Sequence, residues 1–333
     1  MLYHAFARWP GLVTMPFGQA YAAAFGWGWL GVELFFIVSG FVICMTLDRC
    51  SSFGEFMGKR WLRLFPAMLL ASLLIFATAG FVDRPAGIPK LSAIVPGLTF
   101  IDPKWWAFVH GPTDLEGSFW SLYAEMKFYV FAGATYFLLG RRWVIAGLLS
   151  GLAIYWVTLA PHLGLAHYAL FLLDVPYWAW FACGALFYES YRSGRARAFW
   201  AAVLVGAIAS IVPVPGVGII PNMEFVPLLG FPLVLLFAGA LTRPSIQRCL
   251  SNRFLLFVGF ISYPLYLIHE QAMIGIIREL PPWLPAPVLF VVPAGILMGA
   301  AYGIAKYGEP SLRRFALFSA GDYARAPARH LGS

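Results

Sequence analysis

Charged residues are scarce in this chain of 333 residues. They make up 11% of the sequence, and hydrophobic residues reach 61%, whereas charged residues form about a quarter of a typical soluble domain. So little charge excludes an intrinsically disordered chain, which needs few apolar residues and many charges. The composition is instead typical of an integral membrane protein.

Cysteines are also few, and they are scattered. Cys44 and Cys183 lie in apolar stretches, and Cys50 and Cys249 lie near the expected cytoplasmic ends of spans. None has an obvious partner on the outer side, so we predict no disulfide. The sequence has no metal-ligand spacing and no HExxH pair, which predicts no metal cofactor. The opening residues lack a basic segment and a cleavage site, so we expect no cleavable signal peptide.

Ten apolar stretches fill most of the chain. A helix needs about 20 mainly apolar residues to cross a bilayer. We therefore predict an all-α integral membrane protein with about ten transmembrane helices, the first of which, Met1–Ala7, is truncated at its N-terminus. Residues 1–314 form a single transmembrane domain, and residues 315–333 form a cytoplasmic tail. The other spans are expected at Trp29–Leu47, Leu64–Phe81, Phe119–Leu139, Trp143–Leu159, Ala166–Tyr188, Ala198–Ile211, Phe225–Leu241, Leu255–Ile277 and Ala286–Lys306.

Lysine and arginine residues divide unequally between alternate connections. Seventeen of the 23 fall in one set of connections, five fall in the other, and Lys127 lies inside a span. Because cytoplasmic loops carry the basic excess, this predicts a multi-pass protein of the inner (plasma) membrane with a cytoplasmic C-terminus. The net charge of +8 reflects this topology. The basic residues are spread over five connections, so we predict no nucleic-acid partner.

Ionisable residues inside spans are costly and often functional. A histidine beside a carboxylate can take a proton from a hydroxyl group. The alternative is that such residues only tie helices together by hydrogen bonds, which we favour for Glu33, Asp174 and Glu270. The predicted topology places five of them at one depth, in the outer halves of their spans: His4, Glu33, Glu125, His269 and Glu270.

Two further clusters have alternative interpretations. In the segment 53–66, Arg60 and Arg63 lie on one helical face with Lys59 alongside. This basic group either meets anionic lipid or docks a phosphorylated cofactor. Aromatic side chains near the outer face either form an interfacial belt or stack on sugar rings; they are Trp105, Trp106, Trp120 and Tyr123.

Six segments stand in order along the chain and together carry a resemblance. They are LYH (2–4), WLGVELFFIVSGFVI (29–43), FMGKRWLRLFP (56–66), FWSLYAEMKFY (119–129), GFISYPLYLIHE (259–270) and EPSLRRF (309–315). They resemble the membrane-bound acyltransferase 3 family. The resemblance implies transfer of an acyl group, chiefly acetyl, from cytoplasmic acyl-CoA to a hydroxyl of a cell-envelope or exported glycan. It implies membrane lipid and a glycan as partners and acyl-CoA as donor, and it specifies neither the acceptor sugar nor the oligomeric state.

The resemblance also implies roles for individual residues. His4 matches the catalytic histidine of the family, and Glu125 matches the glutamate of its W-S-L-x-x-E motif. Arg60 and Arg63, with Lys59, match the basic motif expected near the CoA phosphates. Members of the family carry further residues before the histidine, including an arginine, which is why we expect a shortened first helix.

The remaining matches concern the path of the substrates. Ser39 and Gly40 belong to the F-F-x-x-S-G motif, where a small residue permits either close helix approach or passage of a thin ligand arm. We expect Ser39 to lie near the donor. We expect Glu33 and His269 to lie near the acceptor. Trp120 and Tyr123 complete the expected acceptor site.

In the predicted mechanism, His4 is the general base or is itself transiently acylated, and Glu125 orients it or positions the sugar. Two other functions remain open at this stage. A transporter or flippase would also have many spans, although it often shows matching halves, which this chain lacks. A catalytically inactive family member is the other alternative.

Overall fold

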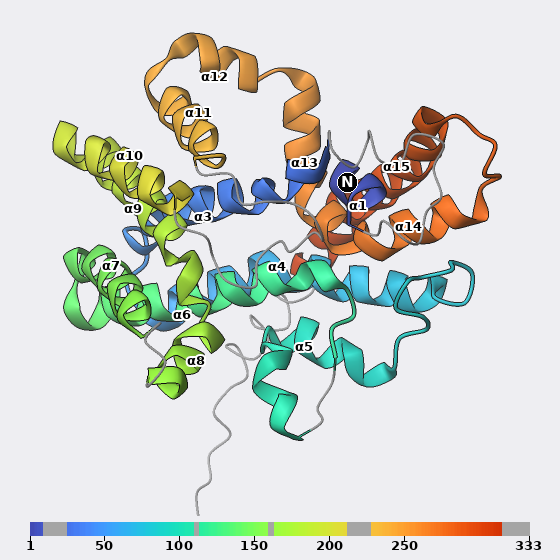
Figure 1. Ribbon diagram of the computed structural model, residues 1–333, viewed down its shortest axis with the longest axis horizontal. Helices are drawn as coiled ribbons and strands as arrows, with labels where there is room; N and C mark the ends of the chain where they lie inside the picture. The colour runs from blue at the N-terminus through green and yellow to red at the C-terminus, as the bar shows by residue number, and fades with distance from the viewer. Residues whose placement is uncertain (9–24, 110–112, 159–162, 212–227, 315–333) are drawn as a thin grey trace, which may run out of the picture.

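The computed structural model describes residues 1–8, 25–109, 113–158, 163–211 and 228–314. Within these ranges the regular elements are all helical, which confirms the all-α prediction. The helices α3 (Gly31–Leu47), α4 (Phe53–Thr78) and α6 (Trp120–Leu139) run along the long axis of the molecule (Figure 1). The other α-helices are α1 (Leu2–Phe6), α5 (Ile94–Thr99), α7 (Arg141–Val157), α8 (Gly164–Leu172), α9 (Trp178–Ser193), α10 (Ala196–Ile211), α11 (Phe231–Thr242), α12 (Pro244–Leu250), α13 (Arg253–Ile268), α14 (Glu270–Glu279) and α15 (Ala286–Gly303).

Three helical segments are long and apolar enough to cross a membrane, namely Gly26–Leu47, Phe53–Thr78 and Ala286–Arg314. Two more candidates are bent pairs: α8 meets the segment Val175–Ser193 at 67°, and α12 meets α13 at 64°. The described residues therefore contain three candidate spans, or up to five if each bent pair counts as one. These apolar helices support a membrane protein, and the arrangement of about ten spans stays a prediction.

Two stretches expected to be continuous helices are interrupted. The stretch Ala166–Tyr188 breaks after α8, where Asp174 adopts a left-handed backbone with φ of 55°. Aspartate tolerates this conformation better than most residues because its short polar side chain can bond locally. The stretch Leu255–Ile277 is divided at His269, since α13 ends at Ile268 and α14 begins at Glu270. Both interruptions occur at ionisable residues.

The segment 53–66 is the start of the long helix α4. The Ser52 side chain accepts a hydrogen bond from the Glu55 backbone N–H at 3.2 Å, which caps the helix. The Glu55 carboxylate reaches back to the Ser51 N–H at 2.8 Å and so satisfies a second free donor. Because no break separates them, Arg60 and Arg63 stand in the first three turns of a candidate span.

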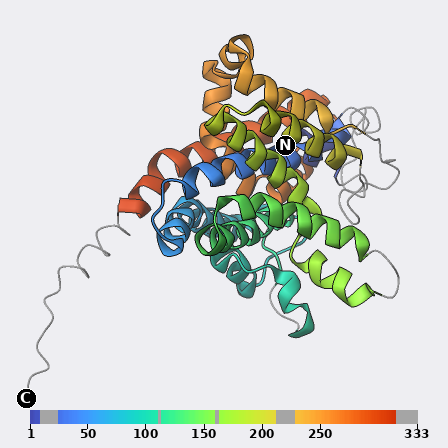
Figure 2. The same cartoon turned by 90° about the vertical axis from the view of Figure 1, so that its left-hand side faces the viewer.

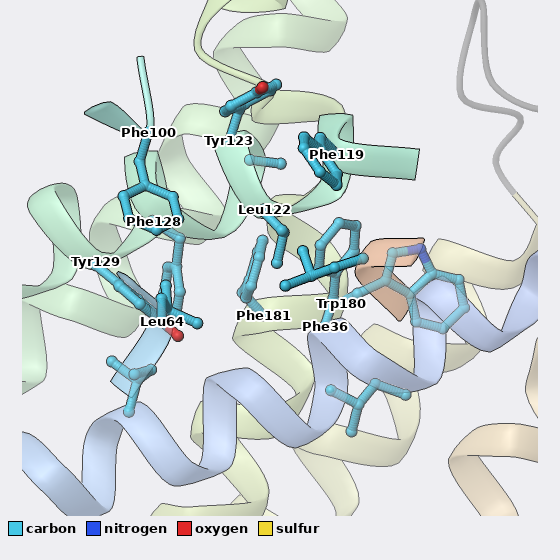
Figure 3. Packing of buried hydrophobic residues seen from close by; sticks show 14 of the residues in the cluster. Phe36, Leu64, Phe100, Phe119, Leu122, Tyr123, Phe128, Tyr129, Trp180 and Phe181 are labelled. Atoms are coloured by element: carbon cyan, nitrogen blue, oxygen red, sulfur yellow. The ribbon is translucent and has the colours of Figure 1, made fainter. Parts of the chain in front are cut away.

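Helices α3 and α9 cross at unusually close range. A Cβ atom at Gly40 would lie 2.2 Å from the Phe181 backbone oxygen, and one at Gly184 would lie 2.0 Å from the Ile37 oxygen. Phe181 also stacks on the Phe128 ring at 4.1 Å between centroids in the core drawn in Figure 3. Of the two interpretations offered for Gly40, close helix approach is the one that the structure supports.

We expect Gly184→Ala to destabilise the folded protein, because the new methyl group would overlap backbone that cannot move independently of α3. Overpacking a core costs about 1–3 kcal/mol, and a backbone clash belongs at the upper end of that range. Thermal unfolding in detergent measures the effect. Gly31→Ala is the matched control, since a Cβ at Gly31 meets nothing within 4 Å. Equal melting temperatures for the two variants would contradict the close crossing.

Helix α14 is fastened to the connection that follows α4. The Gln271 side-chain oxygen accepts from the Ala86 N–H at 3.2 Å, and Arg278 pairs with Asp83 at 2.8 Å. These two contacts hold α14 against the connection that follows α4.

The two views show how the rest of the chain is spread. The orange segment that holds α12 and the teal segment that holds α5 lie on opposite sides of the molecule (Figures 1 and 2).

Candidate functional site

Two histidines and a carboxylate meet at the α13–α14 junction. We call His4, His269 and Glu270 the histidine cluster. The rings of His4 and His269 are nearly perpendicular, with centroids 4.7 Å apart. His4 Nδ1 lies 3.8 Å from Glu270 Oε1, and the Glu270 side chain is 2% exposed. An imidazole and a carboxylate so placed are suited to moving a proton.

The orientation of His269 is set by its own helix. Its Nδ1 atom lies 2.9 Å from the Tyr266 backbone oxygen. Because a carbonyl oxygen only accepts hydrogen bonds, we assign the proton of the neutral ring to Nδ1, which leaves Nε2 with a free lone pair. The Tyr266 hydroxyl in turn contacts Ser121 Oγ at 2.6 Å and the Ser118 backbone oxygen. The junction is therefore anchored on the start of α6.

The Glu270 carboxylate occupies space that a glycine leaves open. A Cβ atom at Gly117 would lie 2.9 Å from Glu270 Oε1 and 3.0 Å from Oε2. Arg8 Nε is 3.9 Å from the same Oε1. Neither His4 Nδ1 nor Glu270 Oε2 has a hydrogen-bond partner within the described parts of the chain, although both atoms are buried. Buried polar atoms without partners carry a desolvation penalty that a functional site can justify.

A second buried carboxylate supports the cluster from the connection before α6. Glu116 is fully buried, pairs with Arg84 at 2.9 Å and accepts from the Gln271 backbone N–H at 3.2 Å. Burial raises the pKa of Glu116 to about 8, and the charge of Arg84 opposes that rise. Desolvation in the same place lowers the pKa of Arg84. Glu116 thus ties the first turn of α14 to the segment before α6.

Glu125 connects two of the long helices. Its Oε1 accepts from Ser39 Oγ at 2.6 Å, which links α6 to α3. Tyr129 and the charges of Arg60 and Arg63 also act on this carboxylate. The carboxylate found beside His4 is that of Glu270, and the expectation that Glu125 orients His4 or positions the sugar stays a prediction. Position within a span indicates depth, but it does not tell which helices are neighbours.

The three basic residues near the start of α4, Lys59, Arg60 and Arg63, make different contacts. Arg60 donates to Thr46 Oγ1 at 3.2 Å and lies over the Tyr129 ring, at 5.9 Å from its centroid. Arg63 is exposed and lies over the Tyr263 ring at 5.4 Å. Lys59 instead forms an exposed ion pair with Glu55 at 2.6 Å. The two arginines therefore belong with the Glu125 region, and Lys59 is engaged at the helix start.

Helix α13 runs from the neighbourhood of Arg63 to the histidine cluster. The Tyr263 hydroxyl donates to the Leu64 backbone oxygen at 2.9 Å. His269 follows six residues later, so it lies about 9 Å further along the helix axis at a rise of about 1.5 Å per residue. An extended ligand bound beside Arg63 could span that separation.

The observed contacts of the other expected acceptor residues are with groups outside the histidine cluster. Trp120 packs edge-on against Phe36 at 6.0 Å and beside Tyr177 at 5.0 Å. Tyr123 is 1% exposed, within the core (Figure 3). Glu33 Oε2 is buried near Gly230, where an added Cβ would lie 2.6 Å from it. These contacts favour packing for the two aromatic residues, and the acceptor role expected for the three residues stays a prediction.

Lys127 forms ion pairs with two aspartates that could not be identified from the sequence. Its ammonium group lies 2.5 Å from Asp102 Oδ2 and 2.6 Å from Asp174 Oδ2. Lys104 completes the group at 3.0 Å from Asp174 Oδ1. Lys127 was recognised as a lysine inside a span, and the cost of burying it signalled that acidic partners exist. Within the described ranges, no group of three or more histidine, cysteine, aspartate or glutamate residues could hold a metal ion.

Comparison with known proteins identifies the family of the chain. The sequence model described as "Acyltransferase domain" (Acyl_transf_3) matches residues 1–305. This chain belongs to the acyltransferase 3 family. It is therefore a membrane-bound O-acyltransferase, as the sequence motifs implied, and the transporter interpretation is set aside.

Two relatives share most of the chain's length, and a third shares a shorter part of it. The exopolysaccharide production protein ExoZ of Rhizobium meliloti is 29% identical over 86% of this chain and 90% of its own. Nodulation protein 10 of Rhizobium leguminosarum bv. viciae is 25% identical over 85% and 82%, respectively. The peptidoglycan O-acetyltransferase OatA of Listeria monocytogenes is 27% identical over 38% of this chain and 22% of its own. No solved structure matches.

Proposed function

We propose that this member of the family transfers an acetyl group from acetyl-CoA to a hydroxyl of a cell-envelope or exported glycan. The observation that carries the proposal is the histidine cluster, where an imidazole has a carboxylate neighbour at the end of the helix whose Tyr263 lies beneath Arg63. The glycan acceptor is suggested by the names of relatives, which include an exopolysaccharide production protein and a peptidoglycan O-acetyltransferase.

In this proposal the reaction is a direct acyl transfer. His4 takes the proton of the acceptor hydroxyl as the oxygen attacks the thioester carbonyl carbon. The carbon–sulfur bond then breaks, and the imidazolium returns its proton to the leaving CoA thiolate. The products are the O-acetylated glycan and free CoA, so neither an oxidant nor a metal is needed to balance the step.

The donor would enter from the cytoplasm. Arg60 and Arg63 would bind the CoA phosphates, for which guanidinium groups form bidentate bonds. Glu125, held by Ser39, would position the pantetheine arm between the arginines and the histidine cluster. We further propose the ten-span inner-membrane topology with a cytoplasmic C-terminus, which the unequal division of basic residues supports.

The test is a transfer assay. Membranes that hold the protein would receive radiolabelled acetyl-CoA and an envelope glycan, and label in the glycan would be counted against the release of free CoA. We expect labelled glycan, and slow hydrolysis of the donor when no acceptor is added. Absence of both labelled glycan and donor consumption, with the protein present in the membrane, would contradict the proposal.

A second experiment tests the donor site. We expect Arg60→Ala and Arg63→Ala to raise the KM for acetyl-CoA and leave the KM for the acceptor nearly unchanged, since each removes contacts to the donor phosphates. A lost charged hydrogen bond costs about 1.5–3 kcal/mol, which corresponds to roughly a 10- to 150-fold weaker interaction. Arg142→Ala is the matched control, because Arg142 is exposed and lies over Trp143 instead. An unchanged KM for acetyl-CoA in both arginine variants, with normal expression, would indicate that the arginines meet lipid.

A further inference from the structure

We propose that Glu270 is the positioning residue of His4. Its carboxylate holds the imidazole with the proton on Nδ1, so that Nε2 is the atom that takes the proton of the acceptor hydroxyl. This assignment rests on the function proposed above, because it gives a partner to the base of that reaction.

The geometry of the pair supports a contact that closes during the reaction. The 3.8 Å between His4 Nδ1 and Glu270 Oε1 is about 1 Å longer than a charged hydrogen bond. His4 Nδ1 and Glu270 Oε2 are both buried without a hydrogen-bond partner in the described ranges. Catalytic hydrogen bonds are often long in the absence of substrate and tighten when it binds. Closing the distance to the carboxylate would give His4 Nδ1 the hydrogen-bond partner that it lacks in the described ranges.

Charge distinguishes the two histidines. Nδ1 of His269 faces the neutral Tyr266 carbonyl, whereas Nδ1 of His4 faces a carboxylate. The negative charge stabilises the imidazolium ion that forms when a base takes a proton, and a neutral carbonyl does so less. His4 is therefore the better base of the two.

Glu270 keeps its own protonation state throughout. The acceptor oxygen–hydrogen bond breaks and the proton moves to His4 Nε2, while the oxygen forms its bond to the thioester carbon. The imidazolium is then neutralised when the proton passes from Nε2 to the CoA sulfur as the carbon–sulfur bond breaks. Once the contact has closed, the carboxylate accepts one hydrogen bond from Nδ1 both before and after the proton moves to Nε2, which is the role of an orienting group.

The experiment compares kcat and KM in Glu270 variants. We expect Glu270→Ala to lower kcat by about tenfold or more, with the KM for acetyl-CoA changed by less than about twofold, because the contact acts in the transition state. Glu270→Asp should recover part of the loss. The matched control is Glu279→Gln, which removes an exposed carboxylate from the other end of α14.

A double-mutant cycle separates positioning from a structural role. If Glu270 acts through His4, Glu270→Ala should cause no further loss in a protein that already carries His4→Ala. A purely structural loss would multiply with that of His4→Ala. Gly117→Ala offers a second route, because its Cβ would lie within 3.0 Å of both Glu270 oxygens and would displace the carboxylate without deleting it. We expect the same selective fall in kcat.

The outcomes distinguish this inference from the function on which it rests. An active wild-type protein with unchanged kcat in Glu270→Ala, or with losses that multiply in the double mutant, overturns the role of Glu270 and leaves the function intact. If the wild-type protein transfers no acetyl group, the proposed function itself fails. Should Glu270→Ala not fold, Glu270→Gln and Gly117→Ala carry the same test, and normal kcat in both overturns the assignment.

Discussion

Changing His4 to alanine should abolish acetyl transfer while the protein remains folded in the membrane. General base catalysis contributes about 10²- to 10⁴-fold, so the loss should be nearly complete. His4→Gln should fail as well, because an amide forms hydrogen bonds but does not take a proton from a hydroxyl. The measurement is kcat for labelled glycan, normalised to the amount of folded protein.

Two other histidines provide the controls. His167→Ala should leave kcat unchanged, because His167 stacks on Tyr155 at 4.6 Å and contacts Thr158, apart from the cluster. His269→Ala should have an intermediate effect, since it removes the ring that packs against His4. If His4→Ala kept more than about a tenth of wild-type kcat, a base worth 10²-fold would be excluded. His269 would then be the leading candidate.

The sequence predicts the depth of a residue within its apolar stretch, but it does not predict which residues of other helices lie beside it. The depth of His4, His269 and Glu270 followed from their positions within apolar stretches, and the structure brings these three together. Their contact joins α1 to α14, which are more than 260 residues apart in the chain. Apolar periodicity carries no information about which distant helices are neighbours, so the position of Glu270 beside His4 could not be predicted, and the role expected for Glu125 stays a prediction.

The interruptions in the helices escaped prediction for a different reason. Hydropathy measures how long an apolar stretch is, and it does not register a change of direction within that stretch. At Asp174 the backbone is left-handed, and its carboxylate lies beside Lys127 of another helix. At His269 the helix ends where the imidazole contacts the Tyr266 carbonyl one turn earlier. In both places the chain changes direction at an ionisable residue whose side chain makes a polar contact, which hydropathy does not register.

The close crossing of α3 and α9 at Gly40 could be predicted only as one of two alternatives. The sequence offered both close approach and a ligand path for Gly40, and only the distance to the Phe181 carbonyl decided between them. Small residues at a helix crossing allow either arrangement. The decision needed the partner helix α9, whose own Gly184 faces Ile37 in the reciprocal position. A pair of glycines in separate apolar stretches is therefore a signal for a crossing, although it does not identify its partner.

Lys127 should prove the most sensitive position for stability outside the histidine cluster. Its ammonium group is 9% exposed and neutralises two aspartates that are each 3% exposed, Asp102 and Asp174. Lys127→Met preserves the length of the side chain but leaves the two buried carboxylates to share Lys104, which is 37% exposed and lies 3.7 Å from Asp102 and 3.0 Å from Asp174. Removal of one partner of a buried ion pair costs about 3–5 kcal/mol, so we expect a large fall in the thermal stability of the detergent-solubilised protein.

A compensating change makes this prediction specific. Adding Asp174→Asn to Lys127→Met removes one buried charge, and asparagine also tolerates the left-handed backbone at this position, so stability should be partly restored. Lys104→Met should cost less, because Lys104 is 37% exposed and its removal leaves Lys127 in place. If Lys127→Met melted at the wild-type temperature, the two aspartates would not require a buried cation, and the break between α8 and α9 would need another explanation.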